Sequence, residues 1–270
     1  MKSAAAGMHD GMDDLIQYVV ADGIATLTFN RPAVMNALDP ETIVAFRRVC
    51  ERVEHDAEAR VVVLRGAGPA FLAGGDVASF KTHLPKIAGL VVEMAGELHR
   101  GILALRRAPK PVIASVHGAV AGAGMSIMLA CDLVIAADDT KFTLAYSRIA
   151  TSPDGGASWF LPRVAGYQKA MELLLLVDTV DTAALQSMGI INRAVPAAEL
   201  APATVALAQR LAAGPAIAYA ETKALVNASQ EHGLEEHLAA EAGAFARCAG
   251  HADFAEGVTA FVEKRKAVFE

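Results

Sequence analysis

The sequence has few cysteines, and they are not arranged as a disulfide framework. Cys50, Cys131 and Cys248 are the only three in 270 residues, and they lie far apart. Two of them fall in apolar helical patterns, whereas disulfide-stabilised domains carry paired cysteines at short spacings. We therefore expect reduced cysteines and a cytoplasmic protein.

Long hydrophobic runs and an excess of positive charge are also missing. No uninterrupted apolar segment reaches the roughly 20 residues that span a bilayer. Residues 1–13 lack an apolar signal core, their aspartates argue against a transit peptide, and we expect a disordered lead-in there. The formal net charge of −6 argues against an extended nucleic-acid interface. We therefore expect neither a membrane nor a nucleic acid as partner.

Several sequence motifs of catalysis and cofactor binding are absent. There is no P-loop, and Gly118 to Gly124 does not match the dinucleotide-binding G-x-G-x-x-G pattern. Ser126 lacks the second glycine of a nucleophile elbow. No cysteine–histidine cluster has metal-ligand spacing. His232 and His237 are separated by about 140° on a helix, so we interpret them as solvated. We expect no metal.

What is present is ample apolar material, 54% of the residues, in alternating strand and helix patterns. This alternation predicts an α/β core over residues 14–200, followed by an all-helical region over 201–270. Strands are predicted over 16–20, 24–29, 60–65, 112–116, 132–136 and 141–144. Helices are predicted over 39–53, 91–107, 159–164 with Ser158 as cap, 168–176, 182–188, 197–213, 216–228, 232–247 and 252–266, and residues 80–90 are interpreted as a mobile flap.

The stretch from Pro111 to Asp132 is the centre of this pattern. A buried strand over 112–116 leads into Gly118–Gly124, where no residue is larger than valine, and an apolar helix follows from Met125. Small residues let another group approach the backbone closely, and the first N–H groups of a helix have no intrahelical partner. The stretch either holds a developing negative charge or only allows tight helix–strand packing.

Two further segments add polar groups to this picture. Gly74 and Gly75 follow an apolar run and precede an acid, which gives a second place where backbone N–H groups are laid bare. Asp154 lies in a Pro-Asp-Gly-Gly turn, where an aspartate often only hydrogen-bonds its own backbone. Together, two N–H donors and one carboxylate can stabilise an oxyanion and move a proton.

These segments carry a family resemblance over nearly the whole chain. The sequence resembles the enoyl-CoA hydratase/isomerase (crotonase) superfamily, whose signatures occur here in the expected order. They are Asn30-Arg-Pro-x-x-x-Asn-Ala-Leu, Phe71-x-Ala-Gly-Gly-Asp76, His117-Gly-x-x-x-Gly-x-Gly124, Cys131-Asp132-x-x-Ile-Ala136, Pro153-Asp-Gly-Gly, Leu161-Pro-Arg-x-x-Gly166, Ala184-x-x-x-Gly189 and Phe261-Val-Glu-Lys-Arg-Lys266.

The resemblance implies a crotonase-like α/β spiral of ββα units, with a C-terminal helical oligomerisation region and assembly as a homotrimer or a dimer of trimers. It implies an acyl-CoA thioester substrate, with coenzyme A entering as part of the substrate and no separate cofactor. The thioester carbonyl would lie between the N–H groups of Gly75 and Ala123. Residues implied to bind coenzyme A are Ala73, Gly74, Asp76, Val77, Phe261 and Lys264; Lys264 is equally explained as a cation at a helix C-terminus.

The departures from the family pattern indicate the reaction. Family hydratases hold water with two glutamates, and those positions align here with Ser126 and Tyr146, whose ordinary pKa values are too high for a base near neutral pH. Asp154 aligns with the aspartate of isomerase-like and dehalogenase-like members. We therefore interpret the chain as an acyl-CoA isomerase-type enzyme with Asp154 as proton shuttle and with Ser126 and Tyr146 lining the acyl pocket. The alternatives are Asp154 as nucleophile and a catalytically depleted acyl-CoA-binding homologue.

Overall fold

The computed structural model describes residues 14–270, so the predicted lead-in over 1–13 lies outside the described residues. The strands are β1 (Ile16–Ala21), β2 (Ile24–Phe29), β3 (Val61–Gly66), β4 (Val112–Val116), β5 (Ala119–Ala121), β6 (Leu133–Ala137), β7 (Lys141–Thr143), β8 (Val180–Asp181) and β9 (Arg193–Val195). The α-helices are α1 (Pro40–His55), α2 (Val77–Thr82), α3 (Ile87–Arg107), α4 (Ala123–Leu129), α5 (Ala157–Ala165), α6 (Tyr167–Leu176), α7 (Thr182–Ser187), α8 (Leu200–Ala212), α9 (Ala216–Ala228), α10 (Leu234–Ala249) and α11 (Ala252–Glu263).

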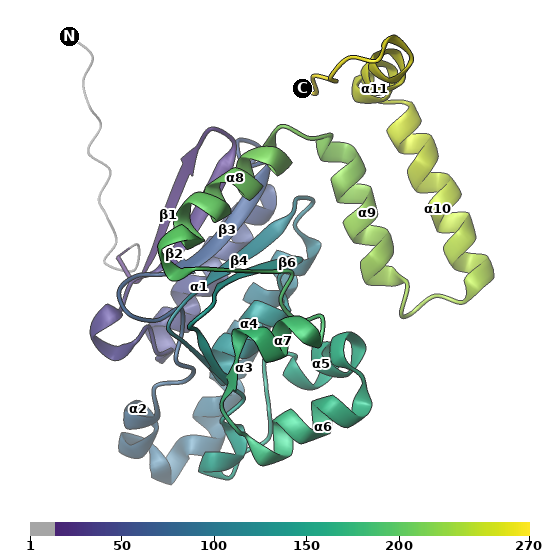
Figure 1. Cartoon of the computed structure of the whole chain (residues 1–270). Coiled ribbons are helices and arrows are strands. Elements are labelled where there is room, and N and C mark those ends of the chain that lie inside the picture. The colour runs from purple at the N-terminus through teal and green to yellow at the C-terminus, as the bar shows by residue number, and fades with distance from the viewer. Residues whose placement is uncertain (1–13) are drawn as a thin grey trace.

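Two sheets form the core of the chain (Figure 1). The larger has the order β1-β2-β3-β4-β6-β9 and is parallel from β2 onward, after the predicted β1–β2 hairpin. The smaller has the order β5-β7-β8. The chain enters the larger sheet at β4 and β6 and the smaller one directly afterwards, at β5 and β7, before the next helix. This alternation matches the predicted spiral of ββα units.

The central strands are buried on both faces, and their side chains divide with the period of two that a strand imposes. Val61 and Val63 of β3 belong to the apolar cluster under α8, whereas Val62 and Leu64 belong to the cluster on the opposite face. Burial on both faces explains the continuous apolar runs in the sequence, because parallel sheets covered by helices lack the polar alternation of half-exposed strands.

Helix α8, the first helix after the predicted division at residue 200, covers one face of the larger sheet. Leu200 and Ala208 pack into the cluster with Val61, and Ser115 Oγ of β4 is 2.8 Å from Thr204 Oγ1 of α8. The helical segment that leaves the core therefore begins at α9, and α9, α10 and α11 form an arm that projects from it (Figure 1).

A buried ionic cluster anchors this arm. Lys223 of α9 has a side chain 9% exposed, and its Nζ lies 2.8 Å from Asp132 Oδ2 and donates to the Leu105 carbonyl at 2.8 Å. Asn227, one turn later, exchanges hydrogen bonds with the side chain and the carbonyl of Arg106 at the end of α3. Because buried charges must be paired, these contacts fix the angle at which α9 leaves the core.

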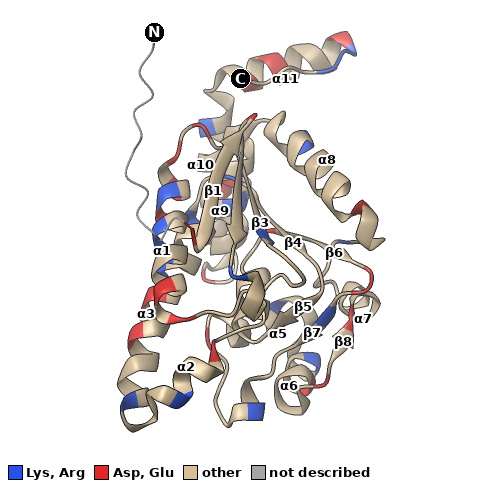
Figure 2. Ribbon diagram, turned by 90° about the vertical axis from the view of Figure 1, so that its left-hand side faces the viewer, with Lys and Arg blue, Asp and Glu red and all other residues tan. Residues whose placement is uncertain are grey.

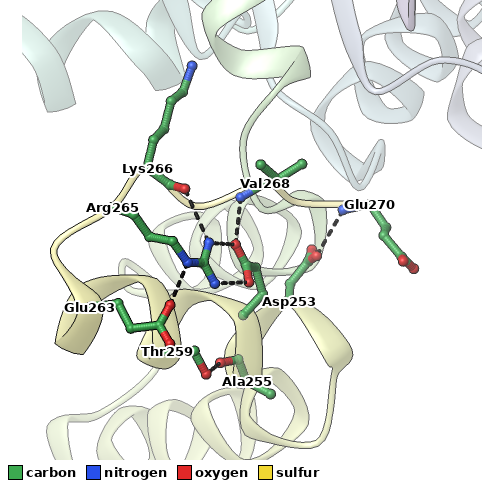
Figure 3. A network of polar contacts seen from close by, with 9 residues as sticks. Asp253, Ala255, Thr259, Glu263, Arg265, Lys266, Val268 and Glu270 are labelled. Atoms are coloured by element: carbon green, nitrogen blue, oxygen red, sulfur yellow. Dashed lines mark hydrogen bonds and ion pairs between the residues drawn. The ribbon is translucent and has the colours of Figure 1, made fainter.

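The end of the chain folds back on α11 (Figure 3). The Arg265 guanidinium donates to both carboxylate oxygens of Glu256, at 2.7 and 2.8 Å, and to Glu263 at 2.7 Å. These donors, with the Val268 N–H, lower the pKa of Glu256 to about 2. The helix predicted to reach residue 266 thus ends at Glu263, and Lys264 follows in the left-handed conformation with φ 54°.

Residues 80–90 belong to α2, a short 3-10 turn and the start of α3, and their interpretation as a mobile flap stays a prediction. Two other local predictions need correction. Ser158 does not cap α5, because the helix starts at Ala157, two residues earlier than predicted, and Gly156 occupies the cap position. His232 and His237 are half-buried instead of solvated, with ring centroids 5.8 Å apart.

Charged residues of both signs are distributed over the helices and loops, and the central strands carry few of them (Figure 2).

Among residues 14–270, no helix is both long enough and apolar enough to cross a membrane. The same residues contain no group of three or more His, Cys, Asp or Glu side chains placed to hold a metal ion.

Candidate active site

The two glycine-rich segments predicted to expose backbone N–H groups lie side by side. Leu72 forms an isolated parallel bridge with Val120 of β5, in which Leu72 N–H donates to Ala119 and Ala121 N–H donates to Leu72. The segment after Leu72 therefore runs directly alongside the turn that enters α4. The sequence did not predict β5, because its three small residues look like part of a loop.

Glycine is required for this approach. Gly74 has φ 94°, and a Cβ built on it would lie 3.1 Å from the Ala121 carbonyl oxygen. A Cβ on Gly124 would lie only 2.3 Å from the Leu72 carbonyl oxygen. The small residues thus serve tight packing as well as close backbone approach, and the holding of a developing negative charge stays a prediction.

The N–H groups of Gly75 and Ala123 are available for a ligand. Gly75 is bridged to Leu38 through its neighbours, because Leu38 N–H donates to Gly74 and Asp76 N–H donates to Leu38, both at 2.8 Å. Ala123 is the first residue of α4, where N–H groups lack intrahelical acceptors. No acceptor within residues 14–270 hydrogen-bonds either N–H. Both residues line one cavity of about 500 Å³.

Asp154, in the turn before α5, lines the same cavity as Gly75 and Ala123. Gly155 and Gly156 follow with φ 59° and 86°, and a Cβ on Gly155 would lie 2.8 Å from Ser126 Cβ. The Gly155 N–H donates to His99 Nε2 at 3.3 Å. Sequence reasoning missed His99, since nothing distinguishes it from other polar residues of an amphipathic helix.

Tyr146 contacts the Asp154 carboxylate directly. Its hydroxyl donates to Asp154 Oδ1 at 2.8 Å and lies 2.8 Å from Ser126 Oγ. Burial raises the pKa of the Tyr146 hydroxyl well above its ordinary value, and the charge of Asp154 raises it further. The hydroxyl is therefore a hydrogen-bond donor at neutral pH and cannot act as a base.

Ser126 does not lie where the sequence analysis placed it. It is 0% exposed and does not line the cavity; it sits behind Tyr146, and its hydroxyl is 2.9 Å from the Asp154 carbonyl oxygen, which accepts from it. The reason is its position one turn into the fully buried helix α4. Of the two residues expected to line the acyl pocket, Tyr146 lines this cavity and Ser126 does not.

The rest of the cavity wall is mainly apolar and comes from α1, α2, α3 and the 3-10 turn after Tyr146. This wall includes Ile43, Val77, Phe80, Val91, Val92, Met94, Leu98 and Ile149. Such a wall suits an apolar group attached to a carbonyl held by Gly75 and Ala123.

The residues implied to bind coenzyme A divide into two groups. Ala73, Gly74 and Val77 line the cavity, but the Asp76 side chain accepts from Ser79 N–H at 3.2 Å and lies 3.5 Å from Arg31. The second group, Phe261 and Lys264, lies at the end of the arm and does not line this cavity.

A larger cavity of about 860 Å³ lies between α3, α5 and α9, behind the Asp154 turn. It is lined by Arg106, Trp159, Phe160 and Lys223 among others, and neither Gly75 nor Ala123 reaches it. The smaller cavity alone brings together the two unpaired N–H groups and a carboxylate, so it is the candidate active site.

Comparisons with known proteins agree with this architecture. The sequence model of the family described as Enoyl-CoA hydratase/isomerase matches residues 20–270. A "Probable enoyl-CoA hydratase" of Rhodobacter capsulatus is 38% identical over 94% of this chain and 97% of the relative. The "1,2-epoxyphenylacetyl-CoA isomerase" of Escherichia coli K12 is 35% identical over 96% and 99%.

A crystal structure of an enoyl-CoA hydratase from Polaromonas sp. JS666 superimposes with a TM-score of 0.90 at 34% identity, over 94% of this chain and 99% of that one. This overlap confirms the crotonase-like α/β spiral predicted from the sequence. The chain belongs to the enoyl-CoA hydratase/isomerase family.

Proposed function

We propose that the chain is an acyl-CoA isomerase-type enzyme that moves a proton between two carbons of a thioester by way of an enolate. The observation that carries the proposal is the meeting of two unpaired backbone N–H groups and one carboxylate, Asp154, in a mainly apolar cavity whose wall also includes Arg148 and Thr151. Donors aimed at a developing oxyanion stabilise the enolate that forms when an α-proton leaves.

In the proposed reaction the thioester carbonyl accepts from Gly75 and Ala123. Asp154 takes the proton from the α- or γ-carbon and returns it to another carbon of the same chain. The reaction takes in coenzyme A as part of the substrate and uses no separate cofactor. Ala73, Gly74 and Val77 contact the thioester end of the ligand.

Isomerisation is favoured over hydration by the residues beside Asp154. The two-glutamate arrangement of the family hydratases uses a second carboxylate to hold and activate water, and the side chains beside Asp154 are instead two hydroxyl groups, Tyr146 and Ser126. The Tyr146 hydroxyl stays protonated because burial raises its pKa. A single carboxylate is enough for moving one proton between two carbons.

We expect the purified protein to bind CoA thioesters and to hydrate crotonyl-CoA poorly. A panel of trans-2-enoyl-, 3-enoyl-, dienoyl- and 1,2-epoxyphenylacetyl-CoA, followed by mass spectrometry, tests for isomerisation and hydration together. Crotonyl-CoA hydration at roughly 10–10³ per second, typical of an efficient enzyme, would contradict the proposal. Isomerisation of at least one thioester without mass gain would support it.

We also propose a homo-oligomer with three-fold symmetry. Large apolar side chains on the arm are exposed, with Phe245 67% and Phe261 86% accessible, which is unusual for a free surface. A neighbouring subunit would cover this face and bring Phe261 and Lys264 to the coenzyme A of another site. We expect sedimentation at micromolar concentration to give a trimer or hexamer mass; a monomer would refute the assembly.

A further inference from the structure

Asp154 is held by hydrogen bonds at its side chain and at its backbone. Its Oδ1 accepts from Tyr146, its carbonyl oxygen accepts from Ser126, and the next N–H donates to His99. No hydrogen bond from residues 14–270 reaches Oδ2. One carboxylate oxygen is therefore occupied, and the other is left for a ligand.

Ser126 links this arrangement to the oxyanion donors. It lies three residues after Ala123, on the first turn of α4. The same helical turn that presents the Ala123 N–H thus contacts both the Tyr146 hydroxyl and the Asp154 carbonyl. Because a helical turn is rigid, it fixes the carboxylate relative to the position of the thioester oxygen.

We propose that Tyr146 and Ser126 are positioning residues that hold Asp154 so that Oδ2 alone carries the proton from one carbon of the acyl group to another. This inference rests on the proposed isomerase function. A freely rotating carboxylate would present either oxygen and exchange its proton with water between the two steps. A carboxylate clamped at Oδ1 keeps the proton on one oxygen at one distance from the substrate.

The geometry excludes a simpler role for Ser126. Its hydroxyl has no access to the cavity, so any effect of Ser126→Ala on proton transfer must pass through Tyr146 or Asp154. Tyr146 lines the cavity and could act on the substrate directly. Tyr146→Phe is therefore also made in an Asp154→Asn background, which separates an effect through Asp154 from a direct effect on the substrate.

The test uses the full-length protein and but-3-enoyl-CoA, whose α-protons are activated by both the thioester and the double bond. Exchange of these protons in D₂O and isomerisation are followed by mass spectrometry and NMR for Tyr146→Phe and Ser126→Ala. We expect kcat to fall about 10- to 100-fold for Tyr146→Phe, as for loss of one hydrogen bond to a charged group. KM should stay within about threefold, since the Gly75 and Ala123 donors are unchanged.

Proton retention gives a readout that a packing role would not move. If the contact at Oδ1 keeps the transferred proton on Oδ2, the deuterium gained from D₂O per isomerisation should rise in Tyr146→Phe. Tyr18→Phe is the matched control: Tyr18 donates to Asp56 Oδ2 at 2.6 Å away from the cavity, and its loss should leave both kcat and deuterium uptake unchanged.

A double-mutant cycle decides whether Tyr146 acts through Asp154 or directly on the substrate. If Tyr146 acts through Asp154, Tyr146→Phe should cause no further loss in an Asp154→Asn background. An equal loss in both backgrounds would overturn the inference and place Tyr146 on the substrate. Should Tyr146→Phe fail to fold, Ser126→Ala takes its place in the cycle, and unchanged kcat and deuterium uptake in it would also count against the inference. Asp154→Asn that isomerises the thioester like the parent, or a parent that isomerises none, would instead overturn the proposed function.

Discussion

Replacing Asp154 by asparagine is expected to lower isomerase turnover by about 10²–10⁴-fold, the usual contribution of a positioned general acid–base. Asparagine keeps the size of the side chain and an oxygen that accepts from Tyr146. It lacks the second carboxylate oxygen, which is the group that takes up and returns the proton. The effect should appear in kcat on whichever thioester of the panel is isomerised.

Affinity for the acyl-CoA should change little in the same variant. The thioester is held mainly by the backbone N–H groups of Gly75 and Ala123, and the substitution leaves them in place. Calorimetry with a non-reactive acyl-CoA measures this separately from turnover. A large loss of affinity together with turnover would indicate a collapsed cavity instead of a missing proton carrier.

The competing explanation is that Asp154 only braces its own turn. Asparagine serves turns as well as aspartate does, so that explanation predicts turnover within a factor of about three of the parent. Asp181→Asn provides the matched control, because Asp181 accepts from Ala184 N–H at 2.9 Å as the cap of α7. It should leave turnover unchanged and show that aspartate-to-asparagine replacement at a local backbone contact is tolerated.

The sequence could predict those parts of the fold that depend on local chemistry. The β1–β2 hairpin follows from Asp22 and Gly23, both of which have positive φ, between two β-branched runs. The start of α1 follows from Asp39 and Pro40, because the Asp39 carboxylate accepts from Thr42 N–H at 2.8 Å. In each case neighbouring residues supply the stabilising contact.

The errors arise where distant segments decide the structure. The packing of α8 on the sheet could not be predicted, because α8 contacts strands more than 60 residues earlier and helical periodicity says nothing of that partner. Residues 80–90 carry a weak pattern, yet part of the segment forms the cavity wall as α2 and the start of α3. Length and composition do not distinguish such a wall from a mobile loop.

The candidate site shows the same division. Its backbone donors could be located because a glycine at a close contact leaves a trace in the sequence. The contact of Tyr146 with Asp154 leaves no such trace, because it depends on the irregular path of the eight residues that separate them. The contact of His99 with Gly155 leaves none because it joins two distant segments. Ser126 was assigned to the pocket from an alignment position, whereas the depth of its side chain depends on the packing of α4.

The approach of the two glycine-rich segments leads to the second large effect, the expected result of Gly124→Ala. The new Cβ would lie 2.3 Å from the Leu72 carbonyl oxygen, a backbone atom that cannot move without displacing the residues that follow it. Gly75 is three residues after Leu72, so the shift changes the separation of the two N–H donors. Loss of one oxyanion donor typically lowers kcat by about 10²–10³, and we expect a fall of that size.

Gly96→Ala is the matched control for this substitution. Gly96 is also a helical glycine, in α3, but a Cβ built on it meets nothing within 4 Å. Alanine there should raise stability by about 0.5–1 kcal/mol through helix propensity and leave turnover unchanged. Gly124→Ala should instead lose about 1–3 kcal/mol, as overpacked cores do. Thermal unfolding and turnover of both variants check the pair. If Gly124→Ala loses stability but keeps full turnover, the thioester oxygen is not held between these two segments, and the placement of the oxyanion site at Gly75 and Ala123 is wrong.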